Sequence, residues 1–187
     1  VVRSDIRSSF VGSSTTVAPG VAMTFTITVV DANNACAPLA GYAVYLWHCN
    51  ALGQYSLYDL PTESYLRGVQ ITDANGQVTC TTLVPGCYAG RYPHMHFEVF
   101  SSQANATSGR SAVLVSQFAV PAAVCTAVYS GASATYGQSG SRFPSTSITA
   151  DNVFGDNSSA QMTVMTPTIS GSVDAGYTAT ATVGIAT

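Results

Sequence analysis

Residues 21–30 read VAMTFTITVV, and this stretch decides the fold class. Met23, Phe25, Ile27 and Val29 alternate with smaller or polar residues, mostly threonine. Because successive side chains of a strand point to opposite faces of a sheet, this period of two predicts a strand with one buried face and one exposed face.

The same period recurs along the chain. Further strands are predicted at Ala43–Trp47, Gln77–Val84, His94–Phe100, Val113–Val120 and 177–185, separated by turn signals such as Asp73-Ala74-Asn75-Gly76. No segment shows a long helical period. We therefore expect an all-β fold, a β-sandwich of mixed or antiparallel strands. It forms one domain over residues 1–187, with residues 1–20 as an N-terminal arm and 152–159 as a turn-rich loop.

Charged residues make up only 8% of the 187 residues, against roughly a quarter in average soluble proteins. Six arginines, no lysine and nine acidic residues give a net charge of −3. With no basic patch to neutralise phosphates, nucleic acid is not an expected partner. No run approaches the roughly 20 apolar residues of a spanning helix, so no membrane segment is expected. The sequence does not define an oligomeric state.

Five cysteines occur at positions 36, 49, 80, 87 and 125, and none forms a Cys-x-x-Cys motif. The spacing, the richness in Ser and Thr and the absence of lysine favour an exported protein with one or two disulfides. On this interpretation the chain is mature and its leader has been removed. Asn105-Ala106-Thr107 and Asn157-Ser158-Ser159 match the glycan acceptor pattern, which matters only in a eukaryotic host.

Two of the three histidines form the motif His94-Met95-His96 at the head of a predicted strand. Side chains at i and i+2 of a strand share a face, so both imidazoles can reach one metal ion. Glu98 continues the same face and is a candidate third ligand, and His48 is the remaining histidine. The motif alone does not choose between Zn, Cu and Fe.

Three ordered segments resemble the intradiol ring-cleavage dioxygenases, the relatives of protocatechuate and catechol dioxygenases. They are Ala51-x-Gly53-x-Tyr55, Leu66-Arg67-Gly68-Val69-Gln70-x-Thr72-Asp73-x-x-Gly76, and Pro85-Gly86-x-Tyr88-x-Gly90-Arg91-x-x-His94-x-His96. The resemblance covers residues 36–120 and is closest to the short secreted members. The segments 2–7 and 151–154 also look like that subgroup. It implies the family β-sandwich core without the N-terminal helical region of the larger catechol enzymes.

The resemblance implies a non-haem ferric ion, Fe(III), held by two tyrosinates and two histidines, which by motif position are Tyr55, Tyr88, His94 and His96. Tyr92 competes with Tyr88 because it lies closer to His94 in sequence. A hard cation such as Fe(III) suits phenolate oxygen, and metal binding must lower the pKa of each tyrosine far below about 10.

The activity implied by the resemblance is cleavage of a catechol ring by O2 to a cis,cis-muconate-type diacid. Tyr88 is the ligand that leaves the iron and takes up a substrate proton. Arg91 is expected to stabilise charge on the ring and its intermediates, and Gln117 looks like a supporting catalytic glutamine. Arg67 is expected to be structural, paired with Asp73 or Asp59. Specificity is expected in residues 5–20, 50–65 and 136–158.

Two other functions stay open at this point. The chain could be a non-catalytic binding module that retains the family shell, or a zinc or copper enzyme that uses His48, His94 and His96. One hypothesis for the disulfides pairs Cys49 with Cys87, beside the ligand segments, and Cys36 with Cys125. It leaves Cys80 as a free thiol.

Overall fold

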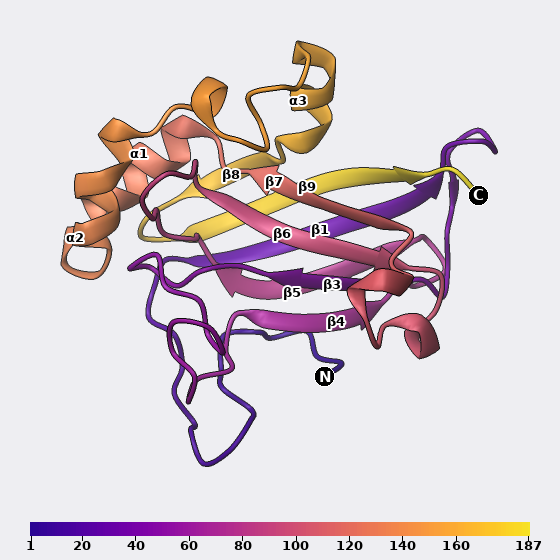
Figure 1. Cartoon of the computed structure of the whole chain (residues 1–187), viewed down its shortest axis with the longest axis horizontal. Coiled ribbons are helices and arrows are strands. Elements are labelled where there is room, and N and C mark those ends of the chain that lie inside the picture. The colour runs from indigo at the N-terminus through magenta and orange to yellow at the C-terminus, as the bar shows by residue number, and fades with distance from the viewer.

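Nine strands in two sheets form the framework of the fold, and a computed structural model describes all residues from 1 to 187 (Figure 1). The five-stranded sheet has the order β2-β1-β9-β8, with β5 also paired to β1, and the four-stranded sheet has the order β4-β3-β6-β7. The predicted all-β sandwich is confirmed. The strands are β1 (Ala22–Asp31), β2 (Ala37–Pro38), β3 (Ala43–Trp47), β4 (Arg67–Ile71), β5 (Gln77–Leu83), β6 (His94–Phe100), β7 (Leu114–Ala119), β8 (Thr168–Ser172) and β9 (Gly176–Ile185).

Strand β1 buries the side chains that its alternation selects. Met23, Phe25, Ile27 and Val29 are at most 1% exposed, while the residues between them lie on the outer face of the sheet. β5 pairs with one edge of β1 in antiparallel register, and β9 runs parallel along the other edge. With neighbours on both edges, β1 is the central element of its sheet.

Aromatic side chains join the two sheets. Phe25 of β1 lies edge-on to Phe118 of β7, with ring centroids 5.2 Å apart, and Phe118 stacks on Phe97 of β6 at 4.3 Å. These residues occupy the inner faces. Because side chains alternate along a strand, His94 and His96 are on the other face of β6, outside the sandwich core.

Three helices lie where the sequence analysis expected none: α1 (Ala122–Gly131), α2 (Ser133–Arg142) and α3 (Ser159–Met165). All three sit along one side of the molecule in Figure 1. α1 buries Val124, Cys125, Val128 and Tyr129, a helical stripe too short to stand out in the sequence. No helix precedes β1, and no helix of the chain is long and apolar enough to cross a membrane.

Tyr136 anchors α2 to the sandwich, and its removal is testable. Its fully buried hydroxyl accepts a hydrogen bond from the backbone N–H of Val21 (3.0 Å) and donates one to the carbonyl of Val84 (2.7 Å). We expect Tyr136→Phe to lower the free energy of unfolding by about 1–3 kcal/mol, because two buried backbone groups lose a partner. Urea denaturation measures this. The Tyr177 hydroxyl makes no hydrogen bond within the chain, so Tyr177→Phe should change the free energy of unfolding by less than about 0.5 kcal/mol. Equal losses of stability in the two variants would contradict the anchoring role of Tyr136.

The N-terminal arm is ordered and lies along the edges of both sheets. Val2 forms a bridge with Val69 of β4, and Asp5 forms one with Thr81 of β5. The Arg3 guanidinium donates to the carbonyl of Arg67 from Nε (3.0 Å) and Nη2 (2.7 Å). The arm therefore holds the start of β4 in place.

None of the five cysteines forms a disulfide. The guessed pair Cys36–Cys125 is wrong in this structure, because Cys36 is exposed in the turn after β1 whereas Cys125 is buried on α1, toward the opposite end of the molecule (Figure 1). Cys49 and Cys87 are both buried, but each thiol hydrogen-bonds to backbone carbonyls instead of forming the guessed link. Cys80 is a buried thiol as expected.

Candidate metal centre

The first two donors come from one strand. His94 and His96 project from the outer face of β6, as their spacing predicts, and His96 lies opposite Gln117 of β7 and Trp47 of β3 in the sheet register. The Trp47 ring stacks on His96 with centroids 4.7 Å apart and planes 8° from parallel. His94 Nδ1 lies 2.5 Å from the carbonyl of Tyr92. A carbonyl only accepts, so Nδ1 carries the proton and Nε2 is free to bind a cation.

Tyr55 is positioned by a tight turn between β3 and β4. The Asn50 side-chain oxygen accepts hydrogen bonds from the backbone N–H groups of Leu52 (2.9 Å) and Gln54 (3.0 Å), which closes the turn. Gly53 has φ +81°, and a Cβ there would come within 2.6 Å of the Cys87 carbonyl. Glycine at this position therefore lets the Tyr55 loop approach the Tyr88 loop closely.

The four predicted ligands converge on one point. The Tyr55 hydroxyl lies 3.4 Å from the Tyr88 hydroxyl, 3.3 Å from His94 Nε2 and 3.0 Å from His96 Nε2. His94 Nε2 is also 3.2 Å from the Tyr88 hydroxyl and 3.1 Å from His96 Nε2. Donors held about 2.0–2.1 Å from one cation in tetrahedral array are about 3.3 Å apart. These separations therefore fit four ligands around a single metal ion.

The protonation states of these groups also fit a metal site. Burial lowers the pKa of His94 to about 4 and, with the nearby His94 charge, that of His96 to about 3, so both imidazoles are neutral ligands at pH 7. Burial raises the pKa of Tyr55 and Tyr88, and the Arg91 charge opposes that shift. A buried phenolate needs a countercharge, which a hard cation bound between these oxygens would supply.

The structure brings Tyr88, and not Tyr92, to the histidines. The Tyr92 ring lies in a separate cluster, edge-on to Phe154 and tilted against Phe143. Its backbone carbonyl, and not its hydroxyl, contacts His94. The motif match favoured Tyr88 over Tyr92, which is nearer to His94 in sequence, and the backbone turns the Tyr92 side chain away from the centre.

Arg91 and Gln117 are held together beside the centre. Arg91 Nη2 donates to Gln117 Oε1 at 2.6 Å, and Arg91 Nε donates to Asp151 Oδ2 at 2.8 Å. The Asp151 side chain is completely buried and also accepts from the backbone N–H groups of Tyr92 and Val153. Sequence reasoning quoted Asp151 only as part of a resembling segment and assigned it no role, since an isolated acid carries no spacing signal.

The other sequence candidates lie away from the four donors. His48 is buried, with Nε2 2.7 Å from the Thr82 hydroxyl and Nδ1 2.8 Å from the Cys49 carbonyl. No group of three or more His, Cys, Asp or Glu side chains is placed to hold a metal, so the hypothesis of a His48–His94–His96 site is wrong. Glu98 lies two residues beyond His96 on β6 and makes no hydrogen bond to any of the four donors. Arg67 binds Tyr45 and Ser56 instead of an aspartate.

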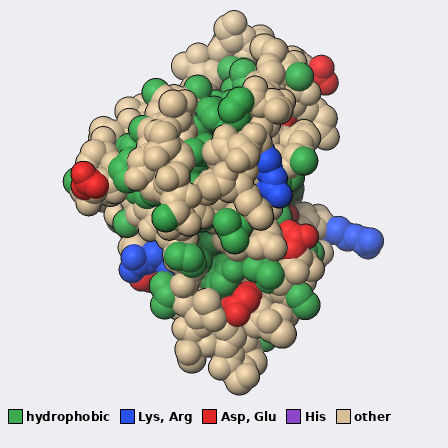
Figure 2. All heavy atoms as spheres, turned by 90° about the vertical axis from the view of Figure 1, so that its left-hand side faces the viewer, with side chains coloured by type: hydrophobic (Ala, Val, Ile, Leu, Met, Phe, Trp, Pro, Cys, Tyr) green, Lys and Arg blue, Asp and Glu red, His purple; other side chains and the backbone are tan.

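The surface at this end of the molecule is predominantly uncharged. Figure 2 views the end where the Tyr55 loop, the N-terminal arm and the helices meet, and hydrophobic side chains there line a hollow with acidic and basic side chains at its rim. Leu52, Leu57 and Tyr58 are among the exposed apolar residues of the Tyr55 loop. This environment favours an uncharged, apolar ligand over a highly charged one.

Two phenol oxygens and two imidazole nitrogens converge on one point on the outer face of a β-sandwich, and this set of donors suits a single hard metal ion. The family model described as "Dioxygenase" matches residues 3–110, and the chain belongs to the intradiol ring-cleavage dioxygenase family. No curated protein matches the chain.

Solved structures support this membership. The chain is similar to an intradiol ring-cleavage dioxygenase from Tetranychus urticae, with 25% identity and a TM-score of 0.77 over 100% of this chain and 87% of that one. It shares the fold of a dioxygenase domain from a Streptomyces sp. SirexAA-E dioxygenase carbohydrate-binding fusion (23% identity, TM-score 0.60, 99% of this chain and 89% of that one). It also shares the fold of catechol 1,2-dioxygenase from Pseudomonas arvilla C-1, with 20% identity and a TM-score of 0.59 over 98% of this chain and 56% of that one.

Proposed function

We propose that this chain is an iron(III)-dependent intradiol dioxygenase that cleaves a catechol with O2 between the two hydroxyl-bearing carbons, giving a cis,cis-muconate-type diacid. The observation that carries the proposal is the convergence of Tyr55, Tyr88, His94 and His96, with donor atoms 3.0–3.4 Å apart. Family membership supports the reaction type.

The four side chains would hold the ferric ion, with both tyrosines as phenolates. When bound, the ion supplies a Lewis-acidic site that chelates the two catechol oxygens and makes the ring reactive toward O2. Two anionic oxygen ligands favour a hard trivalent cation over its softer divalent state. The His96 imidazole stacks on Trp47 and the His94 imidazole is fixed by the Tyr92 carbonyl, so the two histidines provide the rigid half of this site.

Tyr88 is suited to accept a proton from a substrate hydroxyl at its Oη. Tyr55 Oη contacts all three other donors, whereas Tyr88 Oη contacts only Tyr55 and His94. Both tyrosines lie in irregular loops, and with fewer contacts to the other donors Tyr88 can move away from the centre with less disruption than Tyr55. Its phenolate oxygen would then become the base that the incoming catechol needs.

Arg91 provides a fixed positive charge next to the reacting ring. Its Nε and Nη2 are bound by Asp151 and Gln117, which holds the guanidinium in one orientation at 16% side-chain exposure. A preorganised cation in a partly desolvated site stabilises negative charge that develops on the ring during cleavage. Gln117 supports this orientation from the strand next to His96.

The test is iron content together with oxygen uptake. The purified protein, or the protein reconstituted with ferric salt, should hold about one iron per chain and show the red-brown absorption of tyrosinate bound to Fe(III). Oxygen electrode assays with catechol, protocatechuate and hydroxyquinol should show consumption of one O2 per ring cleaved. A colourless protein that binds no iron would reject the proposal, and an iron-loaded protein inert toward all three rings would favour the alternative of a non-catalytic binding module.

A further inference from the structure

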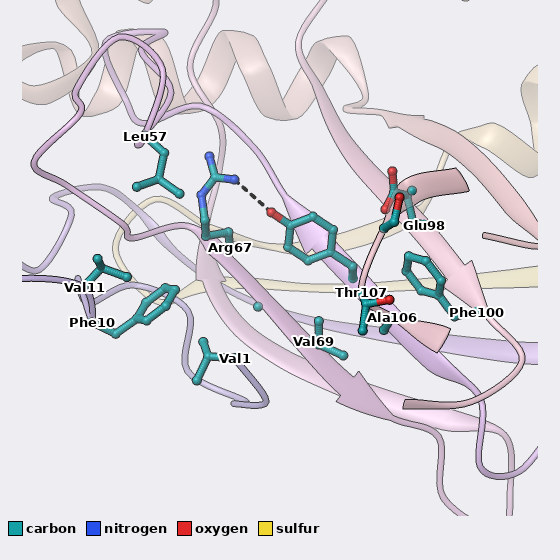
Figure 3. Close-up of a pocket in the computed structure, with 14 residues that line it drawn as sticks. Val1, Phe10, Val11, Leu57, Arg67, Val69, Glu98, Phe100, Ala106 and Thr107 are labelled. Atoms are coloured by element: carbon teal, nitrogen blue, oxygen red, sulfur yellow. Dashed lines mark hydrogen bonds between the residues drawn. The ribbon is translucent and has the colours of Figure 1, made fainter. Parts of the chain in front are cut away.

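A cavity lies on the outer face of the four-stranded sheet, beside the candidate metal centre. Its volume is about 360 Å³, within the size range of sites for small ligands. Aromatic and aliphatic side chains form most of its wall, from the N-terminal arm, the Tyr55 loop and strands β3, β4 and β6 (Figure 3). They include Phe10, Tyr45, Leu57, Val69 and Phe100.

Glu98 is the one carboxylate in the wall of this cavity, which we call the Glu98 cavity. It follows His94 and His96 on the same face of β6, so it lies about 7 Å beyond His96 along the strand. It takes part in neither of the two ion pairs of the chain and receives no hydrogen bond from a protein donor.

The two charged side chains of the cavity wall balance one another. Arg67 is the other charged residue, and Figure 3 shows it and Glu98 on opposite sides of the cavity. The Arg67 guanidinium already donates to the Tyr45 hydroxyl (2.8 Å) and the Ser56 hydroxyl (3.0 Å). Its positive charge nevertheless offsets that of Glu98, so the cavity does not favour a cation. Glu98 therefore needs a neutral hydrogen-bond donor.

We propose that the Glu98 cavity binds a single phenol ring, with the phenol hydroxyl donating to the Glu98 carboxylate. The ring would pack against Phe10, Tyr45 and Phe100, whose apolar faces fit an aromatic ring. The hydrogen bond to an ionised acceptor would provide orientation and specificity for a hydroxyl over a methyl ether.

The Glu98 cavity is separate from the metal centre. Tyr45 stacks on Trp47 (4.8 Å between centroids), and Trp47 stacks on His96 (4.7 Å), so two aromatic layers lie between the cavity and the histidines. Binding there needs no metal and does not rest on the proposed dioxygenase activity.

The experiment uses iron-free protein, so its outcome is independent of catalysis. Titration with 4-ethylphenol, followed by amide chemical shifts, should perturb Val69, Glu98 and Thr107 and leave Tyr55 and His96 unchanged. 4-Ethylanisole, which lacks the hydroxyl proton, should bind at least fivefold more weakly. Benzylammonium should also bind more weakly than the phenol because of Arg67.

Two variants, with one control, test the role of the Glu98 carboxylate and of the empty volume of the cavity. Glu98→Gln keeps the shape but replaces a charged acceptor by a neutral one, and should weaken phenol binding about fivefold to tenfold with little effect on the anisole. Asp174→Asn, in the β8–β9 turn, removes the same charge far from the cavity and should bind normally. Ala106→Phe should fill the cavity and abolish binding. Four results would each overturn the proposal. They are chemical shift changes centred on Tyr55 and His96, equal affinity for the phenol and the anisole, tighter binding of benzylammonium than of the phenol, and unchanged phenol binding by Glu98→Gln.

Discussion

Tyr88→Phe is expected to abolish catechol cleavage and most of the iron-linked visible absorption. The substitution removes one of the four converging oxygen and nitrogen donors while keeping the ring that packs edge-on to Tyr55 and His94. Loss of residues that merely hydrogen-bond to metal ligands typically costs about 10–100-fold in metal affinity or activity. Removal of an anionic ligand that also accepts the substrate proton should exceed this, so we expect a loss of about 1,000-fold or more in kcat/KM.

Tyr92→Phe is the matched control, four residues away in the same loop. The Tyr92 hydroxyl is remote from the donors, and its contact with His94 runs through the backbone carbonyl, which phenylalanine keeps. This variant should retain iron, colour and activity within about threefold. Iron per chain by elemental analysis, the visible spectrum and oxygen uptake measure both variants. Retention of iron and colour by Tyr88→Phe, with loss in Tyr92→Phe, would exchange the roles of the two tyrosines.

Much of the sandwich was predictable because its strands bury one face only. The alternation in β1 and β9 identifies both strands and their inward residues, since Met23, Phe25 and Tyr177 all face the core. Other strands lack this contrast between an apolar face and a polar face. Examples are β4, which has Gly68 and Gln70 on one face, and the short β8. α1 was missed because its apolar stripe covers only three turns and consists mainly of small residues.

The convergence of the four side chains was predictable through their motifs, whereas their surroundings were not. His94 and His96 share a strand face by spacing alone, but Tyr55 and Tyr88 were placed by family resemblance, because no local pattern relates two loops 33 residues apart. Asp151 gained a role only in three dimensions, and Glu98 gained one there that differs from the ligand role suggested by its spacing. Asp151 contacts Arg91, which lies 60 residues earlier in the sequence. Glu98 stands out because it takes part in no ion pair. Long-range contacts of single residues carry no periodic signal.

Asp151→Asn is expected to weaken both the fold and the proposed reaction while leaving the four proposed metal ligands in place. The buried carboxylate accepts from Arg91 Nε (2.8 Å) and Nη2 (3.3 Å), and from the backbone N–H groups of Tyr92 (2.7 Å), Val153 (2.8 Å) and Phe154 (3.2 Å). An amide cannot accept all of these bonds, and its NH2 group would face the guanidinium. Breaking a buried charged pair in this way costs about 3–5 kcal/mol, and about 2–4 kcal/mol is expected here because Arg91 keeps its bond to Gln117.

The pH dependence of this loss has a defined sign. Burial acts to raise the pKa of Asp151, but the hydrogen bonds from Arg91, Tyr92, Val153 and Phe154 outweigh it, so the pKa lies below its ordinary value of 3.8. A carboxyl group with a lowered pKa in the folded state stabilises the protein fully above pH 3.8, and this contribution is lost as the pH falls through the lower folded-state value. The difference in unfolding free energy between wild type and Asp151→Asn should therefore be constant from pH 5 to 7 and shrink at lower pH.

Catalysis should separate the positioning role of Asp151 from a general loss of stability. At a temperature where both proteins are folded, Asp151→Asn should bind iron normally and show a kcat lowered by about 10–100-fold, since Arg91 is no longer held in one orientation. Asp156→Asn changes an exposed acid in the same turn region and should alter neither stability nor kcat. Arg91→Lys keeps the charge but loses the forked contact to Asp151 and Gln117, so it should lower kcat to a similar extent. Wild-type kcat in folded, iron-loaded Asp151→Asn would show that Asp151 supports only the fold and that Arg91 keeps its orientation through Gln117 alone.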